Sequence, residues 1–360
     1  MNLNILVLPG DGIGAEVTRE AVKVLRVVAE KWKHQLTLKE ALLGGIAIHK
    51  TGGPFPAETE KYALEADAVL MGAVGLPEFD EWPPEKRPER GLLGIRKTMG
   101  VYANLRPVRS YKALLDSSPL KNELVDGVDM IIVRELNGGL YYGTPRGIYE
   151  DGPEPRAVNT MAYSKSEIVR IARMSFELAR KRRRKLTSVD KSNVIETSQL
   201  WRRVVVEVAK DYPEVALDHL LVDNAAMQLV LNPKRFDVLV TENMFGDILS
   251  DEGAVLAGSI GMLPSASLGA KKPSGVWTGL YEPVHGSAPD IAGQNKANPF
   301  GAIGSAAALL EYSFGLMEEA QAVNRAMEQV LNSGKVTADL KPKGAPATTE
   351  QVGEAICQAL

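Results

Sequence analysis

Short apolar runs alternate with segments of helical hydrophobic spacing over the first part of the chain. An apolar run at residues 4–8 is followed by a glycine-rich turn, and apolar residues then recur at helical spacing from Val17 to Val28. Residues 36–43 and 68–74 predict two further strands. The second of these is almost wholly apolar, which is typical of a parallel strand buried on both faces. This alternation predicts an α/β sheet covered by helices.

The middle of the chain has a different pattern. After a predicted strand at residues 128–134, the segment Gly138–Gly152 is rich in Gly and Tyr and reads as an extended arm or hairpin. Residues 156–163 predict a further strand, and Ser164 with Glu167 forms a capping box that opens a helix. Later strands are predicted at residues 186–190, 217–222 and 236–241, and helices at 199–210, 225–231 and 248–256. Two more helices are predicted from Pro299 onward and a short one from Thr349.

Composition narrows the class of protein. The 360 residues are 45% hydrophobic and 24% charged, which are ordinary globular values, and the length suggests more than one core. The formal net charge of −3 disfavours a nucleic-acid-binding protein. Cys357 is the only cysteine, so no intrachain disulfide forms, and no apolar run approaches the roughly 18 residues of a membrane helix. We expect a cytoplasmic protein with no membrane or nucleic-acid partner.

One run of basic residues, at 180–185, closes a predicted helix. Cations at the end of a helix complement its dipole, so a solvated helix end is the favoured interpretation. Contact with a polyanion is the alternative, and it would fit a non-catalytic binding module.

The turn Gly10–Ala15 fits a loose glycine fingerprint for dinucleotide binding between a strand and a helix. However, Asp11 and Glu16 lie where a pyrophosphate would approach. A tight turn from strand to helix is therefore an equally good interpretation from the spacing alone.

Arginines mark a candidate site for carboxylates. Arg96 and Arg106 flank a predicted short helix that starts with Leu92 and Leu93. Arg134 follows an apolar run at the end of a strand. Guanidinium groups bind carboxylates in bidentate fashion, so three convergent arginines would suit a dicarboxylate. For any one of them, an ordinary surface arginine is the alternative.

Acidic residues mark a candidate metal site. Asp247 and Asp251 are four positions apart, so a helix would place both carboxylates on one side. A divalent cation with oxygen ligands would relieve their repulsion. Asp223, directly after a predicted strand, is a possible third carboxylate. A solvated acidic helix face is the alternative.

Two further segments contain candidate catalytic or binding groups. Lys191 and Asn193 follow a predicted strand, at the edge of a parallel sheet where ligands commonly bind. A lysine beside a metal has a lowered pKa and can act as a base. The loop from Tyr281 to Asn298 contains His285, one of four histidines, although a purely structural loop is the alternative.

Taken together, these segments resemble the family of isocitrate and isopropylmalate β-decarboxylating dehydrogenases. Residues 243–251 carry the motif most specific to that family, and residues 91–97 with 102–107 resemble its isopropylmalate branch. The likeness extends over nearly the whole chain. It implies a two-domain α/β fold with a mixed sheet and helices on both faces, which is not a Rossmann fold, so the interpretation of residues 10–15 as a pyrophosphate cradle is dropped.

The resemblance also implies the domain organisation. The cofactor-side domain would comprise residues 1–101 and 258–360, and the second domain, for dimerisation, metal and substrate, would comprise residues 102–257. The arm 138–152 would pair with its copy in a homodimer, so that active sites are shared between subunits.

Roles for individual residues follow from the resemblance as expectations. The substrate, 3-isopropylmalate, would be oxidised and decarboxylated in leucine biosynthesis. Lys191 would receive the hydroxyl proton and Tyr141 would protonate the enol carbon. Arg96, Arg106 and Arg134 would hold the carboxylates, Leu92, Leu93 and Val194 would form the isopropyl pocket, and Asp223, Asp247 and Asp251 would hold Mg²⁺ or Mn²⁺, with Asp223 also touching the substrate. Lys191, Val194 and Asp223 would come from the other subunit.

The expected cofactor is NAD rather than NADP, because Asp290 would accept hydrogen bonds from ribose hydroxyls and repel a 2′-phosphate. The residues expected to line its site are Ile13, Glu89, Glu282, His285, Gly286, Ser287, Ala288, Pro289, Asp290, Ile291 and Asn298. The main alternative is a sister enzyme of the same family that acts on isocitrate, homoisocitrate, malate or tartrate. Burying the extra carboxylate of isocitrate against Leu92 would be costly.

Overall fold

Two compact units make up the chain in the computed structural model, which describes residues 1–256 and 258–360. The first unit comprises residues 1–101, 110–119 and 258–360, and the second comprises residues 102–109 and 120–256. The expected domain boundary at 257 falls on the residue outside the description. Each unit is described here by itself.

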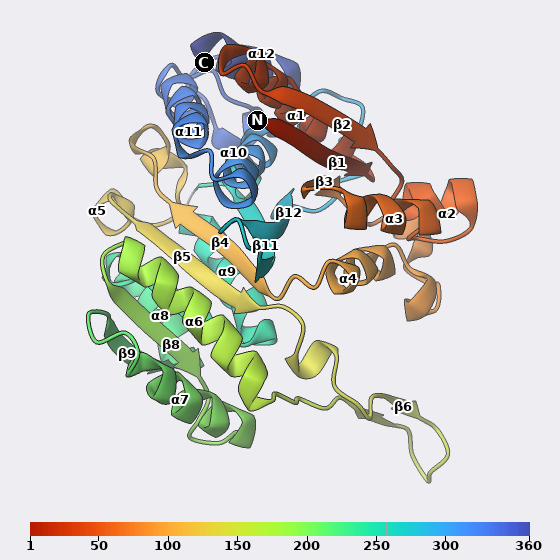
Figure 1. Cartoon of the computed structure of the whole chain (residues 1–360), viewed down its shortest axis with the longest axis vertical. Helices are drawn as coiled ribbons and strands as arrows, with labels where there is room; N and C mark the ends of the chain where they lie inside the picture. The colour runs from red at the N-terminus through yellow and green to blue at the C-terminus, as the bar shows by residue number, and fades with distance from the viewer. Residues whose placement is uncertain (257) are drawn as a thin grey trace. The chain divides into compact units, whose positions relative to one another are not determined.

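The first unit is built on five strands (Figure 1). They are β1 (Asn2–Gly10), β2 (Gln35–Glu40), β3 (Ala68–Ala73), β11 (Pro264–Lys271) and β12 (Trp277–Pro283). Their order is β2-β1-β3-β12-β11. The first four strands are mutually parallel, whereas β11 and β12 form an antiparallel pair. This mixed sheet differs from the all-parallel arrangement of a Rossmann fold, as expected.

Helices cover both faces of this sheet. On one face α1 (Gly14–Lys31) and α10 (Phe300–Phe314) contact the strands, and α11 (Met317–Asn332) and α12 (Thr349–Ala359) pack on these helices. The other face carries α2 (Gly45–Thr51), α3 (Ala57–Glu65) and α4 (Glu89–Thr98). Between that face and its helices lies a buried cluster of Leu6, Leu8, Leu43, Ala63, Val69, Met71, Ile95 and Leu280.

Residues 110–119 belong to the first unit, although the expected boundaries put them in the second. Leu114 is buried there, and the Ser117 hydroxyl donates to the carbonyl oxygen of Leu340 at 3.0 Å. These contacts explain why the segment packs with the C-terminal part of the chain.

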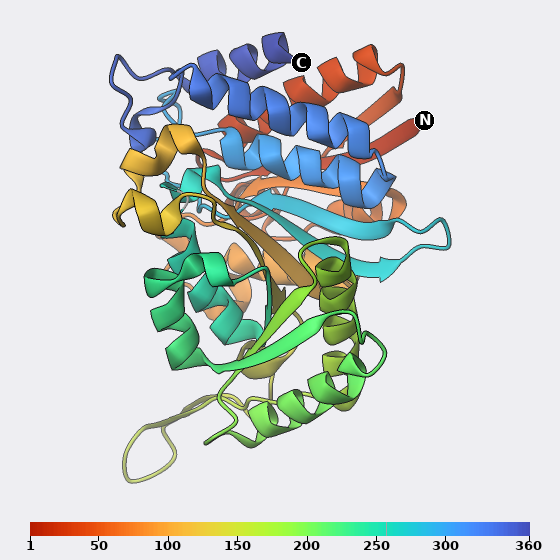
Figure 2. The ribbon, with the colours of Figure 1, turned by 90° about the vertical axis from the view of Figure 1, so that its left-hand side faces the viewer.

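The second unit also has a mixed five-stranded sheet. Its strands are β4 (Ala103–Arg109), β5 (Asp129–Glu135), β8 (Lys185–Asp190), β9 (Ala216–Leu221) and β10 (Val238–Thr241), in the order β4-β5-β10-β8-β9. Only β4 and β5 are antiparallel. Figure 2 shows α6 (Lys165–Lys181) and α7 (Glu196–Ala209) on one face, and α8 (Val222–Leu231) and α9 (Asn243–Leu256) on the other. A short helix, α5 (Asn122–Val125), precedes β5.

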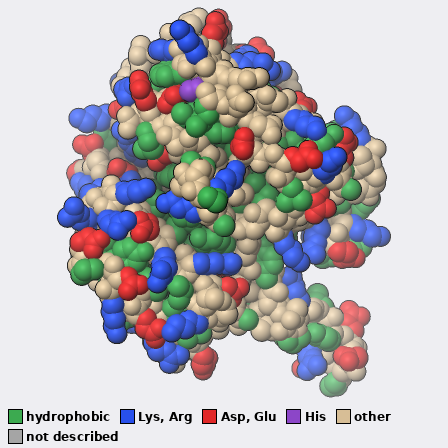
Figure 3. Space-filling view, viewed as in Figure 1, with side chains coloured by type: hydrophobic (Ala, Val, Ile, Leu, Met, Phe, Trp, Pro, Cys, Tyr) green, Lys and Arg blue, Asp and Glu red, His purple; other side chains and the backbone are tan. Residues whose placement is uncertain are grey.

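The glycine- and tyrosine-rich segment forms a hairpin that stands out from the second unit (Figure 3). Its strands, β6 (Gly147–Tyr149) and β7 (Arg156–Val158), pair only with each other, and Ile148 is 75% exposed. The interpretation of residues 138–152 as an arm or hairpin is confirmed in part, because the segment supplies β6 whereas the partner strand β7 lies beyond Gly152. The strand predicted at 156–163 is too long, because pairing with β6 ends at Val158.

Helix α6 confirms two local predictions. Ser164 and Glu167 form the expected capping box, and Arg180 with Lys181 lies in the last turn. The next residue, Arg182, donates to the buried carboxylate of Asp237 at 2.7 Å and to that of Asp129 at 2.8 Å. Part of the basic run therefore serves internal ion pairs. Among the described residues, no helix has both the length and the apolar character that a membrane span requires.

Candidate active site

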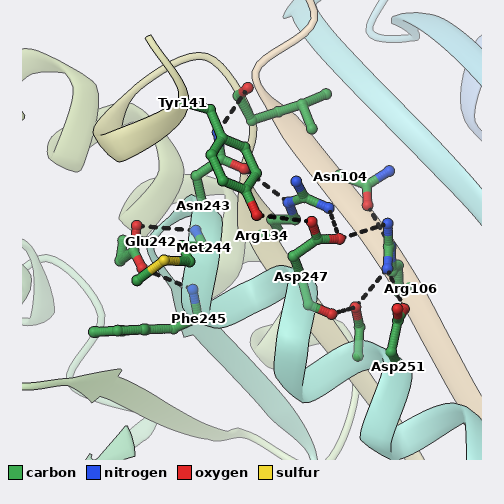
Figure 4. A network of polar contacts seen from close by, with 12 residues as sticks. Asn104, Arg106, Arg134, Tyr141, Glu242, Asn243, Met244, Phe245, Asp247 and Asp251 are labelled. Atoms are coloured by element: carbon green, nitrogen blue, oxygen red, sulfur yellow. Dashed lines mark hydrogen bonds and ion pairs between the residues drawn. The ribbon is translucent and has the colours of Figure 1, made fainter. Parts of the chain in front are cut away.

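Helix α9 places two carboxylates on one side of the second unit. Its first turn is capped by the buried carboxylate of Glu242, which accepts the backbone N–H groups of Met244 and Phe245 at 3.0 and 2.7 Å. The helix lies close to β5, because a side chain at Gly246 would collide with Arg134. Asp247 and Asp251 follow one turn apart (Figure 4).

Two arginines from the neighbouring strands reach these carboxylates. Arg106 lies on β4 and Arg134 on β5, which are antiparallel partners. The Arg106 guanidinium donates to Asp251 at 3.0 Å and to Asp247 at 3.5 Å, and Arg134 donates to Asp247. The sequence interpretation that Arg96 and Arg106 flank one helix is wrong, because Arg96 lies within α4 and Arg106 lies on a strand.

The chemistry of this pair of carboxylates fits a divalent cation. Asp247 and Asp251 share one cationic group, the guanidinium of Arg106, so both can face a single positive charge. Carboxylate oxygens are preferred ligands of Mg²⁺ and Mn²⁺. Within the described residues of one chain, however, no group of three or more acidic, histidine or cysteine side chains is placed to hold a metal.

Tyr141 approaches the same cluster from the turn Gly139–Tyr141. Its hydroxyl donates to Asp247 at 3.1 Å, and the side chain is 37% exposed. Burial and the nearby Asp247 carboxylate raise the pKa of the Tyr141 phenol, so the hydroxyl keeps its proton at neutral pH. The group is therefore an acid that can donate a proton, and it is accessible from solvent.

Lys191 and Asp223 form a separate pair in the second unit. Lys191 follows β8 directly, and its ammonium group lies 3.0 Å from the Asp223 carboxylate. The hydrogen bond from Lys191 lowers the pKa of Asp223. Val194, in the same loop as Lys191, is 63% exposed. The structure of the single chain does not join this pair with Asp247 and Asp251 into one metal site.

In the first unit, a network of backbone contacts gathers residues expected around the cofactor. The Ile13 N–H donates to the Ser287 carbonyl oxygen at 2.8 Å, and the Ser287 hydroxyl donates to the Gly75 carbonyl oxygen at 2.6 Å. The buried Asp11 carboxylate accepts the N–H groups of Gly45, Ile46 and Gly75 at 2.8–2.9 Å. Asp11 thus acts as an internal cap, which supports the interpretation of this turn as a tight strand-to-helix connection.

Arg96 and Glu282 form a buried ion pair in the same unit. Their side chains are 2.5 Å apart, and the Arg96 Nε atom is buried without a hydrogen-bond partner. Leu92 packs partly against the core cluster below α4, and Leu93 is half-buried beside it. Glu89 is exposed at the start of α4.

The loop after β12 holds the remaining expected cofactor residues. Burial lowers the pKa of His285, whose Nδ1 lies 2.9 Å from the Gly286 carbonyl oxygen and whose Nε2 is buried without a partner. Asn298 is buried and accepts the N–H of Phe300 at 3.0 Å at the start of α10. Asp290 and Pro289 are exposed, and Ile291 and Ala288 are half-buried.

Two polar residues that support the arginines were missed in the sequence. The buried amide oxygen of Asn104 accepts from Arg106 Nε at 2.9 Å, and the Ser250 hydroxyl accepts from Arg106 at 2.6 Å. Asn104 shares a face of β4 with Arg106, two positions away, but this relation could not be used because the strand itself was not predicted from the sequence. Ser250 had no signal beyond its place beside Asp251.

The predicted site residues thus fall into two groups. Arg106, Arg134, Tyr141, Asp247 and Asp251 are brought together in the second unit, with the Lys191–Asp223 pair and Val194 elsewhere in that unit. Arg96, Leu92, Leu93 and the cofactor residues belong to the first unit. That the two groups act in one active site stays a prediction.

Comparison with known proteins adds an independent line of evidence. Residues 4–356 match the family described as isocitrate/isopropylmalate dehydrogenase. A 3-isopropylmalate dehydrogenase of Geobacillus kaustophilus is 58% identical over 98% of this chain and 94% of its own length. One of Aquifex aeolicus is 54% identical over 94% of this chain and 92% of its own length.

Solved structures give the same result at greater evolutionary distance. The isocitrate dehydrogenase of Methylococcus capsulatus superposes with a TM-score of 0.86 at 33% identity, covering 99% of both chains. A β-decarboxylating dehydrogenase of Thermococcus kodakarensis gives a TM-score of 0.80 at 36% identity, covering 99% of this chain and 96% of its own.

Proposed function

Because the chain belongs to the isocitrate/isopropylmalate dehydrogenase family, we propose that it catalyses the NAD-dependent oxidation and decarboxylation of (2R,3S)-3-isopropylmalate to 4-methyl-2-oxopentanoate and CO₂ in leucine biosynthesis. 3-Isopropylmalate dehydrogenases use NAD with Mg²⁺ or Mn²⁺. The observation that carries the proposal is the cluster of Arg106, Arg134 and Tyr141 around Asp247 and Asp251. It combines donors for substrate carboxylates, ligands for a divalent cation and a proton donor.

The arginines supply recognition of the two substrate carboxylates. Arg106 is fixed by Asn104 and Ser250, and Arg134 by Asn243, so each guanidinium is oriented before substrate arrives. Such preorganised forks bind carboxylates at little entropic cost. Arg96 is the proposed third carboxylate-binding arginine, and its ion pair with Glu282 would keep its side chain ordered until the substrate binds.

Asp247 and Asp251, with Asp223 of a second subunit, are the proposed metal ligands. When bound, the divalent cation would favour ionisation of the substrate hydroxyl and, once the C2 hydride has passed to NAD, would polarise the 2-oxo group for loss of CO₂. Lys191, as the neutral amine, would accept the hydroxyl proton and become the ammonium ion. Tyr141, whose raised pKa keeps its proton in place, would donate to the enol carbon after decarboxylation.

An apolar pocket for the isopropyl group would distinguish this substrate from isocitrate. Leu92, Leu93 and Val194 offer only hydrocarbon, and burying an unpaired carboxylate against hydrocarbon is costly. Relatives that share more than half of this sequence are named 3-isopropylmalate dehydrogenase, whereas the isocitrate dehydrogenase of Methylococcus capsulatus is 33% identical. A homoisocitrate-, malate- or tartrate-oxidising enzyme is the alternative.

The exposed surface of the second unit supports a homodimer. Large apolar side chains are exposed on α8 and α9, namely Met227, Val230, Leu231, Ile248 and Val255. Exposed apolar side chains concentrated on two neighbouring helices are typical of a surface that a partner covers. The hairpin with Ile148 would pair with its copy, and Lys191 with Asp223 would complete the site of the other subunit. A cytoplasmic location without nucleic-acid or membrane partners stays a prediction.

One assay tests the proposal. NAD reduction is measured with 3-isopropylmalate, isocitrate, homoisocitrate, malate and tartrate, after dialysis against chelator and after return of Mg²⁺ or Mn²⁺. We expect metal-dependent activity, with kcat/KM for 3-isopropylmalate roughly 100-fold or more above that for malate. Asp247→Asn should be inactive, whereas Asp211→Asn, which alters a surface ion pair with Arg173, should retain activity. Higher kcat/KM for another substrate, or full activity in excess chelator, would contradict the proposal.

A further inference from the structure

Asn243 lies at the junction of three parts of the candidate site. It is the first residue of α9, and its side chain is 1% exposed. Its Oδ1 accepts from Arg134 Nε at 2.9 Å, which fixes the orientation of the amide because arginine can only donate. Its Nδ2 donates to the carbonyl oxygens of Leu136 and Gly138 at 3.2 and 3.0 Å. Both amide hydrogens and the amide oxygen are therefore used.

These bonds connect the arginine with the turn that carries Tyr141. Leu136 and Gly138 lie between the end of β5 and the turn Gly139–Tyr141. Through its side-chain amide, Asn243 thus fixes both the start of this turn and the Arg134 guanidinium to the N-terminus of α9, the helix that carries Asp247 (Figure 4).

Tyr163 supports Asn243 and the neighbouring turn through its hydroxyl group and its ring. Its hydroxyl accepts the Asn243 backbone N–H at 3.0 Å and donates to Glu242 at 3.3 Å. Its ring lies so close to Gly138 and Gly139 that a Cβ at either position would collide with it. Neither Tyr163, which is 8% exposed, nor Asn243 has a role in the proposed chemistry.

We propose that Asn243, supported by Tyr163, is a positioning residue that holds the carboxylate-binding Arg134 and the proton donor Tyr141 in place beside Asp247. This inference deepens the proposed function and rests on it. The hydrogen-bond pattern requires an amide at 243, because a carboxylate would face two carbonyl oxygens and a hydroxyl could not bond Arg134 and both carbonyl groups together. It also requires the phenol at 163, because the hydroxyl acts as donor and acceptor at once.

The test uses Asn243→Ala and Tyr163→Phe in the full-length protein. Tyr212→Phe is the matched control, because Tyr212 is also 8% exposed in the second unit and also donates to a glutamate, Glu177, at 3.3 Å. Loss of the Tyr212 hydroxyl removes one hydrogen bond and loss of the Tyr163 hydroxyl removes two, so both phenylalanine variants should lose thermal stability and Tyr163→Phe should lose more. Only Tyr163→Phe should change the kinetics.

We expect Asn243→Ala to lower kcat/KM for 3-isopropylmalate by about 100-fold, since small misplacements of reacting groups cost that much. Tyr163→Phe should lower it by about tenfold, the equivalent of its one hydrogen bond with Asn243. In both variants kcat should fall and KM for 3-isopropylmalate should rise, while KM for NAD, whose expected residues lie in the first unit, should not change. A purely structural loss would reduce the active fraction and leave both KM values as they are.

Calorimetric binding of 3-isopropylmalate provides a readout independent of turnover, and affinity should fall in parallel with the rise in KM. If Asn243→Ala does not fold, Tyr163→Phe decides alone. An active wild-type protein with an unaffected Tyr163→Phe variant, or with equal kinetic losses in Tyr163→Phe and Tyr212→Phe, would overturn the positioning role only. A wild-type protein inactive on 3-isopropylmalate would overturn the proposed function and this inference with it.

Discussion

Asp290 is the residue on which the expected choice between NAD and NADP depends. It is exposed in the loop after β12. The Gln294 side-chain amide donates to the backbone carbonyl oxygen of Asp290 at 2.7 Å, and the Asp290 carboxylate takes no part in that hydrogen bond. A carboxylate there can accept from ribose hydroxyls and repels a 2′-phosphate. We therefore expect kcat/KM for NAD to exceed that for NADP by ~100-fold or more.

Two substitutions distinguish the effect of the Asp290 charge from the effect of the conformation of its loop. Asp290→Ala should lower the ratio of the two kcat/KM values, whereas Gln294→Ala, which loosens the same turn, should leave the ratio unchanged. A wild-type enzyme that uses NADP equally well, or a ratio that does not respond to Asp290→Ala, would argue against this role.

At the scale of single residues, the sequence predicted which side chains belong to the candidate site but not which other side chains bond to them. The spacing of Asp247 and Asp251 was enough to put both on one side of α9. That Arg106 bridges them could not be predicted, because it depends on the pairing of β4 with β5. The sequence also gave no signal for Tyr163, whose function as a brace depends on bonds to residues about 80 positions away.

At the scale of the structural element, one side chain, Asp11, stabilises the turn between β1 and α1. The Asp11 carboxylate accepts N–H groups from the start of α2 and from Gly75. Asp11→Ala should destabilise the protein by at least about 2 kcal/mol, because several backbone donors lose their acceptor in partly buried surroundings. It should also raise KM for NAD, since Gly75 contacts Ser287.

Thermal unfolding and cofactor kinetics measure both effects. Asp11→Asn keeps one acceptor oxygen and should lose less stability than Asp11→Ala. The control is Asp67→Ala, at the connection from α3 to β3, where the side chain is 47% exposed and a change within about 0.5 kcal/mol is expected. Equal stability of Asp11→Ala and Asp67→Ala would contradict the capping role.

Elements with a regular hydrophobic period were predictable, and those shaped by tertiary contacts were not. The capping box of α6 and the apolar strand β3 were found from local pattern. Strand β4 was missed because its sequence, ANLRPVR, contains a proline and two arginines, and antiparallel pairing with β5 makes it a strand. The antiparallel pair β11–β12 was missed for a similar reason, since its glycines and serines are buried by α10.

For the whole molecule, the central prediction is that active sites are shared between two subunits. Lys191→Ala and Asp247→Ala homodimers should each be inactive. A mixed dimer of twofold symmetry contains one site free of both changes, so co-refolding equal amounts should restore about a quarter of wild-type activity. Exchange of subunits is verified with differently tagged chains. A mixture that stays inactive although mixed dimers form would show that each site belongs to one chain.

The bridging position of Arg106 has a thermodynamic consequence for ligand binding. While its guanidinium pairs with both Asp247 and Asp251, the donors that it gives to them are not free to bind an anion. Any cation that takes its place releases it, and any anion that draws it away exposes the two carboxylates. Cation and dicarboxylate should therefore show positive linkage, each raising the affinity for the other by the same factor. In the absence of both, Arg106 and Arg134 together balance the two negative charges of Asp247 and Asp251.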